Sequence, residues 1–108
     1  MSFVIPNQQN DMHSGPVRTA DEWLKQHMRR YLHWAKRNNS LLIVTWDEGL
    51  DEGDNQIPTL IAGAGVIHGD VATPANHYNL LRTIEDMYGL PKLGQSADAV
   101  PLTEAIQP

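Results

Sequence analysis

The sequence predicts an α/β fold with the element order β-α-β-β-α and a mixed sheet flanked by helices. Short apolar segments of strand length occur at 2–5, 41–46 and 58–64. Two longer segments, 20–37 and 77–88, repeat apolar residues at the spacing of a helix. Because turn-forming residues separate these segments, each is expected to form an element of its own.

The first half of the chain is expected to form a strand, a loop, a helix and a second strand. The 2–5 segment is followed by a proline, which suits the end of a strand. Thr19 and Glu22 have the spacing of a capping box, so the helix over 20–37 is expected to start there. The run LLIVTW at 41–46 is continuous and apolar, which is typical of a central strand covered on both faces.

The second half of the chain is expected to form a third strand and a second helix. Glycines late in the 58–64 segment weaken this strand. Asn76 has the position of a helix N-cap, and Gly89 has the position of a left-handed helix stop. The pattern near 102–106 allows one further short helix.

The connections between the predicted strands indicate their directions. A helix joins 2–5 to 41–46, which favours parallel strands if both belong to one sheet. The connection at 47–57 has eleven residues and no helical pattern, which is short for a crossover. The 58–64 strand is therefore expected to run antiparallel to 41–46.

Length and charge limit the classes of function. A chain of 108 residues forms one domain, over 1–108. It buries roughly 65% of the surface that its unfolded form exposes. The net charge of −5 argues against a nucleic-acid or anionic-membrane surface, because both need clustered Lys and Arg. Basic residues do cluster on the first predicted helix, where they indicate a solvated face: Arg29, Arg30, Lys36 and Arg37.

Cysteine usage and apolar runs leave the cellular compartment open. The sequence contains no cysteine, which excludes disulfide and thiol chemistry. No apolar run approaches the length of a membrane span. The N-terminal residues have no basic start, no long apolar core and no small-residue cleavage site, so no signal peptide is predicted.

Carboxylates gather where the predicted central strand ends. Asp47 and Glu48 follow this strand directly, so the strand would hold both in place. Two carboxylates fixed side by side repel each other, and a hard divalent metal with oxygen ligands would cancel their charge. The next acidic residues, Asp51, Glu52 and Asp54, indicate a solvated loop, and the segment lacks the spacing of an EF-hand.

A second group of polar residues follows the predicted 2–5 strand. The segment NQQNDMH supplies Asn10, Asp11 and His13. In open α/β sheets, ligands bind beyond the carboxyl ends of the strands. If the first two strands are parallel, these side chains lie at the same sheet edge as Asp47, and the sequence predicts a site there.

Several motifs together resemble a known family. They are IVTWDEG, NQIPTLIAGAGV and NHYNLLRTIEDMYGLP, with NDMHSG before them and LGQSADAVPLTEAI after them. The sequence resembles the C-terminal part of the bacterial phosphoesterase family that includes acid phosphatases and non-haemolytic phospholipases C, within the alkaline phosphatase superfamily. The match covers nearly the whole chain. This resemblance implies a partial alkaline-phosphatase-like sheet and metal-dependent hydrolysis of phosphate mono- or diesters.

The resemblance also implies roles for the residues at matching positions. Asp47 and Glu48 would bind a divalent metal ion, whose identity the sequence leaves open. Asp11 and His13 would be catalytic residues on the phosphate or leaving-group side, and Asn10 would contact the substrate. In this chemistry an activated hydroxyl attacks phosphorus, and a histidine protonates the leaving oxygen.

His77 has two alternative roles. It matches the histidine that opens a helix in the superfamily, and in two-metal members that histidine binds metal. A helix-opening residue that only hydrogen-bonds locally is the alternative. The sequence leaves both roles open.

The family's Ser or Thr nucleophile has no matching motif in this sequence. In the family, the nucleophile and an acidic-plus-amide pair of metal ligands come from an N-terminal portion. The chain is therefore expected to be a C-terminal lobe that is inactive by itself, with the N-terminal part and a phosphate-ester substrate as partners. Two other classes stay open: a non-catalytic metal- or phosphate-binding module, and a structural remnant that forms homo-oligomers through an exposed sheet edge. Complete family members are often exported.

Overall fold

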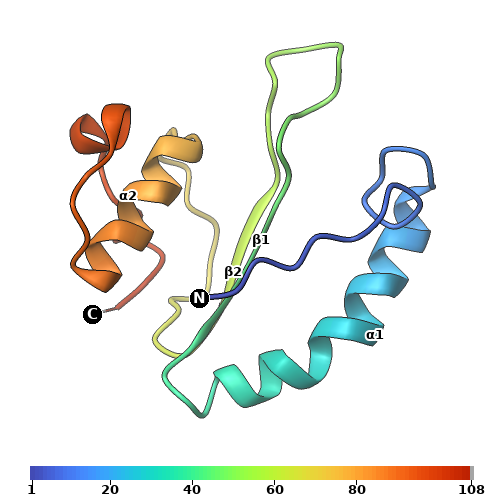
Figure 1. Ribbon diagram of the computed structural model, residues 1–108, viewed down its shortest axis with the longest axis horizontal. Coiled ribbons are helices and arrows are strands. Elements are labelled where there is room, and N and C mark those ends of the chain that lie inside the picture. The colour runs from blue at the N-terminus through green and yellow to red at the C-terminus, as the bar shows by residue number, and fades with distance from the viewer. Residues whose placement is uncertain (108) are drawn as a thin grey trace.

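An antiparallel hairpin of two strands lies at the centre of the computed structural model, which describes residues 1–107 (Figure 1). In chain order the elements are α1 (Val17–Ala35), β1 (Leu41–Thr45), β2 (Thr59–Gly63), α2 (His77–Tyr88) and a 3-10 helix, η1 (Gly94–Asp98). Helix α1 packs against both strands, and α2 packs against η1. Figure 1 shows α1 on one side of the hairpin and α2 with η1 on the other.

The first predicted strand is wrong. Residues 2–5 form no strand, so the observed order is α-β-β-α, and the described chain has a two-stranded antiparallel sheet instead of a mixed one. Phe3 and Ile5 expose 78% and 85% of their surface. An extended segment becomes a strand only when a neighbouring edge pairs with its N–H and C=O groups. Within residues 1–107, no backbone hydrogen bond joins 2–5 to the hairpin.

The hairpin confirms the predicted antiparallel direction of the 58–64 strand. Its register pairs Leu41 with Gly63 and Thr45 with Thr59. The two threonine hydroxyl oxygens lie 2.9 Å apart at the end of the ladder. Gly63 has a φ of +138°, and a Cβ at this position would collide with the carbonyl oxygen of Ser40. The close approach of the two backbones therefore requires the glycine that weakens the strand pattern in the sequence.

Helix α1 begins at Val17, ahead of the predicted start at residue 20. The N–H of Thr19 bonds to the carbonyl of Pro16, which places Thr19 inside the first turn. The predicted capping box between Thr19 and Glu22 is therefore wrong. Pro16 has a φ of −70°, and its missing N–H is not needed at a helix start. Proline thus starts the helix without a side-chain cap.

Helix α1 packs on the hairpin through a narrow face. Ala20 and Ala35, near its two ends, are buried. Tyr31 donates its hydroxyl hydrogen to the carbonyl oxygen of Leu41, 3.0 Å away, which ties the helix to the start of β1. The predicted solvated face is confirmed, because all four of its basic side chains are exposed.

Both predicted ends of α2 are confirmed. The Asn76 side chain accepts the N–H of Tyr78, and the Asn79 side chain accepts the N–H of Asn76. The two asparagines therefore form a reciprocal capping box. At the other end, Gly89 ends the helix in the left-handed conformation, with a φ of +64°.

Buried polar groups hold the segment that follows α2. Glu85 is 2% exposed, and Ser96 is completely buried. The Glu85 carboxylate accepts the Ser96 hydroxyl at 2.7 Å and the Leu93 N–H at 3.0 Å. Each oxygen of the Glu85 side chain therefore has a hydrogen-bond partner, as buried polar atoms require. The 3-10 helix η1 forms at this contact, whereas the described chain has no helix near 102–106.

Arg82 provides a second polar contact on the same helix. Its guanidinium donates to the carbonyl oxygens of Ala97 and Ala99, at 2.8 and 3.2 Å, and to the Asp86 carboxylate at 3.1 Å. The Lys92 ammonium also pairs with Asp86. The hydrogen bond from Lys92, followed by that from Arg82, lowers the pKa of Asp86 below its usual value.

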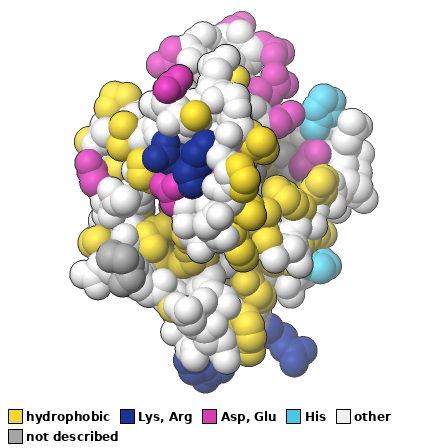
Figure 2. Space-filling view, turned by 60° about the vertical axis from the view of Figure 1, so that its left-hand side comes forward, with side chains coloured by type: hydrophobic (Ala, Val, Ile, Leu, Met, Phe, Trp, Pro, Cys, Tyr) yellow, Lys and Arg dark blue, Asp and Glu magenta, His cyan; other side chains and the backbone are white. Residues whose placement is uncertain are grey.

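Much apolar surface remains exposed. Ala20 and Ala35 are the buried hydrophobic side chains of residues 1–107. The apolar residues of β1 are half-buried, not covered on both faces as predicted. Figure 2 shows an apolar band on one face of the molecule, with acidic side chains gathered at the top, over the hairpin loop. Among residues 1–107, neither helix combines the length and apolarity of a membrane-crossing segment.

Replacing Glu85 with alanine should lower the free energy of unfolding by roughly 1–3 kcal/mol, because the buried Ser96 hydroxyl and the part-buried Leu93 N–H lose an acceptor. Urea denaturation would measure the change. Glu52→Ala removes the same side chain from an exposed loop position and should stay within roughly 0.5 kcal/mol of wild type. Equal effects of the two substitutions would contradict the anchoring role of Glu85.

The lowered pKa of Asp86 should make stability depend on pH. The ionised carboxylate contributes stability above its ordinary pKa of 3.8, and this contribution is lost as the pH falls below 3.8 through the folded-state value. Asp86→Asn should therefore be less stable than wild type at neutral pH and approach it in acid. Urea denaturation at a series of pH values checks this. A difference that does not change with pH would show that the charge on Asp86 contributes nothing.

Candidate functional site

Asp47 and Glu48 follow β1 after one intervening residue, Trp46, at the base of the hairpin loop. Both side chains are exposed. The Asp47 Oδ1 atom accepts the N–H of Glu48 at 3.0 Å. In the described chain, no hydrogen bond engages the second Asp47 oxygen or the Glu48 carboxylate. The carboxylates at the loop tip are exposed, as predicted for a solvated loop: Asp51, Glu52 and Asp54.

Asn55 closes this acidic loop. Its side-chain oxygen accepts the N–H of Gly49 at 2.6 Å. Its φ of +57° is left-handed, a conformation that asparagine tolerates. Gly49 lies so close to the returning chain that a Cβ would be 2.6 Å from the carbonyl oxygen of Gln56. Asn55 is not among the residues predicted for the site, although an asparagine shortly before a strand is a turn signal.

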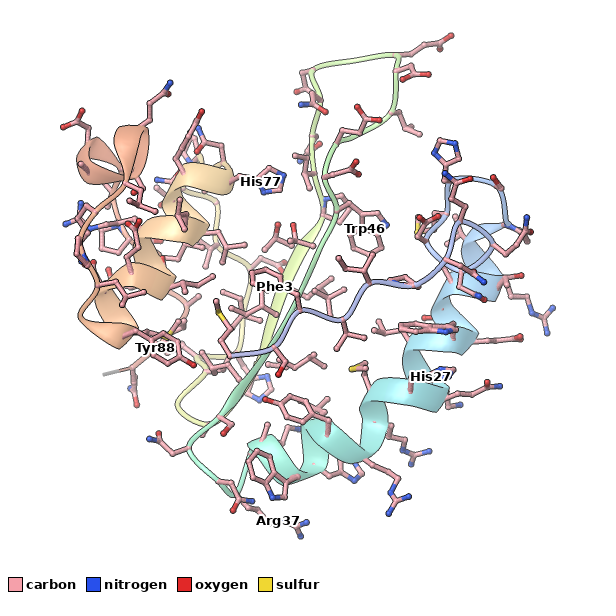
Figure 3. All side chains as sticks on the ribbon, viewed as in Figure 1. Phe3, His27, Arg37, Trp46, His77 and Tyr88 are labelled. Atoms are coloured by element: carbon pink, nitrogen blue, oxygen red, sulfur yellow. The ribbon has the colours of Figure 1, made fainter. Side chains whose placement is uncertain are left out.

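His77, the first residue of α2, contacts Asp47 across 30 residues of sequence. Its Nε2 atom lies 2.9 Å from the Asp47 carbonyl oxygen. Since a carbonyl oxygen only accepts, Nε2 carries the hydrogen and donates it. Figure 3 shows the His77 ring pointing from the start of α2 toward the hairpin. The fold therefore brings His77 to the predicted acidic pair.

Asn10, Asp11 and His13 lie in a compact loop before α1. The Asn10 side-chain N–H donates to Asn7 Oδ1 at 2.7 Å, and Asp11 Oδ1 accepts the backbone N–H of His13 at 2.8 Å. Asn10 and Asp11 are half-buried, and His13 is exposed. These contacts stay within the loop and fix its shape.

The structure does not join this loop to the acidic pair. The strand that was expected to bring both to one sheet edge does not form. In the described residues, no hydrogen bond or ion pair connects Asn10, Asp11 or His13 with Asp47 or Glu48. The roles of the loop residues stay predictions.

The donor atoms at the end of β1 fit part of a divalent-cation site. Within residues 1–107, no three His, Asp or Glu side chains are grouped to hold a metal ion. Asp47 and Glu48 nevertheless supply carboxylate oxygens from consecutive residues, and hard divalent cations prefer oxygen ligands. The ion pairs of residues 1–107 are Arg18–Glu22, Arg82–Asp86 and Lys92–Asp86. No Lys or Arg of these residues therefore neutralises the loop carboxylates.

Comparison with known proteins identifies relatives of this chain. A model of the Phosphoesterase family matches residues 1–91. A phosphatidylinositol-3-phosphatase from Mycobacterium tuberculosis is 51% identical over 104 residues, which cover 96% of this chain and 35% of that protein. A probable acid phosphatase from Kluyveromyces lactis is 29% identical over 101 residues, which cover 87% of this chain and 24% of that protein.

The chain spans 35% of the mycobacterial relative and 24% of the yeast one. No solved structure matches the chain significantly. Both relatives are named as phosphatases, which agrees with the motifs that resemble acid phosphatases. Because the family match extends over residues 1–91 of the 108, the chain belongs to the Phosphoesterase family.

Proposed function

We propose that this chain supplies the metal-binding part of a phosphoesterase that hydrolyses phosphate esters. The contact between His77 and Asp47 carries the proposal, because it joins the start of α2 to the acidic pair at the end of β1 in a member of the Phosphoesterase family. Exposed carboxylates beside a histidine are the residue types that metal-assisted phosphoryl transfer uses.

Asp47 and Glu48 are the proposed ligands of a divalent metal ion. The two carboxylates come from consecutive residues, are exposed and have no basic partner among the described residues, so a cation would relieve their mutual repulsion. When bound, such an ion offsets the charge that develops on the phosphoryl oxygens.

The loop before α1 is proposed to act on the substrate. His13 is exposed and would protonate the leaving oxygen as a general acid. Asp11 holds the loop backbone in shape by accepting the His13 N–H. Asn10 carries an amide that would donate to a phosphoryl oxygen once it leaves its present partner in the loop.

Phosphate monoesters are the substrates we favour over diesters. Both named relatives are phosphatases, and neither name refers to a diesterase. The name of the mycobacterial relative points to phosphoinositides as one specific class of phosphate-monoester substrate.

The attacking hydroxyl and the remaining metal ligands are proposed to come from another part of the phosphoesterase domain. The large share of each relative that this chain does not match leaves room for such a part. Its strands would also cover exposed apolar residues of the hairpin such as Leu60, which is 57% exposed. A non-catalytic binding module is the alternative function, and a self-associating structural remnant is a third.

Asp47→Asn should weaken Mn²⁺ binding by roughly tenfold or more, because it removes one of two adjacent carboxylates. Isothermal titration calorimetry on the purified chain measures the affinity. Asp51→Asn is the matched control, since it removes the same charge from the same exposed loop. Equal weakening by both substitutions would mean that the loop attracts cations only through its overall charge.

The chain alone should not hydrolyse p-nitrophenyl phosphate, with or without added divalent metal. Catalytic groups that act as a unit lose nearly all their effect when the nucleophile is removed. Adding a matching N-terminal part of a phosphoesterase domain should restore turnover, and Asp47→Asn should abolish it. Metal-dependent turnover by the chain alone, lost in Asp47→Asn, would show that this chain contains its own nucleophile.

A further inference from the structure

We propose that His77 is a positioning residue that fixes the backbone of the acidic pair through its Nε2–H. The inference rests on the proposed function, in which Asp47 and Glu48 bind the cation. It assigns Nε2 of His77 to the backbone and not to a metal ion. The hydrogen bond to the Asp47 carbonyl sets the direction of the peptide between the two carboxylates.

The chemistry of the contact defines the role of each ring atom. The Asp47 carbonyl oxygen has no hydrogen to give, so Nε2 of His77 is the donor over the 2.9 Å distance. A ring nitrogen that carries hydrogen has no lone pair with which to bind a metal. Nε2 is therefore committed to the backbone and not to a cation.

A residue can position a loop only if it is itself held in place. His77 follows Asn76, whose backbone N–H and side chain both take part in the capping box with Asn79. The Asn79 side chain also donates to the carbonyl oxygen of Val100 at 2.9 Å. The first turn of α2 is thus tied to a segment more than twenty residues further along the chain.

The rest of α2 is anchored to the same segment. Thr83 is buried, and its hydroxyl oxygen accepts the N–H of Leu102 at 2.8 Å. Arg82 and Glu85 bond to the residues around η1, as described above. Side chains on successive turns of α2 therefore hold the helix that carries His77.

The acidic pair needs such an external contact. The β1–β2 ladder ends at Thr45 and Thr59, before the pair begins. Beyond the ladder, Asn55 bonds to Gly49, and His77 bonds to Asp47, so the two contacts flank Glu48. A pair of ligands that is already ordered loses less conformational entropy when a cation binds, which raises affinity without adding a ligand.

Substitution of His77 separates positioning from ligation. Alanine removes the donor, whereas glutamine places an amide N–H at about the position of Nε2. His77→Ala should speed hydrogen exchange at the Glu48 and Gly49 amides roughly three- to tenfold, and His77→Gln should restore slow exchange. His33→Ala, at an exposed position on α1, is the control and should leave both amides unchanged.

Unchanged hydrogen exchange at the Glu48 and Gly49 amides in His77→Ala would overturn the proposal. Exchange in His77→Gln that is as fast as in His77→Ala would also overturn it. This measurement needs no metal, so it decides the role of His77 even if the chain binds no cation. Absence of Mn²⁺ binding by the wild-type chain would count against the proposed function instead.

Cation binding provides the second readout. His77→Ala should weaken Mn²⁺ binding several-fold, and His77→Gln should bind as wild type does, because glutamine keeps the donor but not an imidazole. Zn²⁺ titration followed by the ¹⁵N signals of the His77 ring should leave the hydrogen on Nε2 and the Nδ1 signal unshifted. Loss of that hydrogen on adding Zn²⁺, a Zn²⁺-induced shift of the Nδ1 signal, or equal weakening of Mn²⁺ binding by both variants would show that His77 is a ligand.

Discussion

The antiparallel ladder between β1 and β2 is the interaction on which the other parts of the structure depend. Helix α1 packs against both strands, and Asp47 follows the ladder by two residues. Beyond β2 the chain runs through Val66, which pairs with Ile106 in an isolated bridge. The Gln107 N–H also bonds to the Gly65 carbonyl at 2.7 Å. The ladder thus connects α1, the acidic loop and the C-terminal segment.

The two sides of the hairpin are stabilised in different ways. On the α1 side, small apolar residues and one tyrosine hydroxyl hold the helix to the strands. On the other side, α2 and its following segment are joined by Arg82, Glu85 and their backbone partners. Polar contacts of this kind require one geometry, because a displaced partner leaves a buried group unsatisfied. They fix the position of α2, the helix that begins at His77.

The exposed apolar surface and the acidic loop are two aspects of one arrangement. A two-stranded sheet is marginally stable without further strands or a covering layer. Here the strands are half-buried, while the loop at their end carries carboxylates that no Lys or Arg of the described residues neutralises. Under the proposed function, further strands would cover the exposed apolar surface of the hairpin. A bound cation would neutralise the carboxylates of the loop.

The sequence by itself determined the elements whose causes are local. Asn76 and Gly89 set the ends of α2 because side-chain capping and a positive φ depend on a few neighbouring residues. The eleven-residue connection set the antiparallel direction of β2. Several motifs in sequence order identified the family, since such motifs depend on residue order and not on contacts.

Only the tertiary structure decided the features that need a distant partner. Residues 2–5 have strand composition, but no edge pairs with them in the described chain, so the first strand does not form. The bond from His77 to Asp47 spans 30 residues, and the Glu85–Ser96 contact spans 11. Neither spacing follows from a periodic pattern. Burial of a carboxylate and the choice of a carbonyl as acceptor depend on how the elements pack, and packing is what local sequence leaves open.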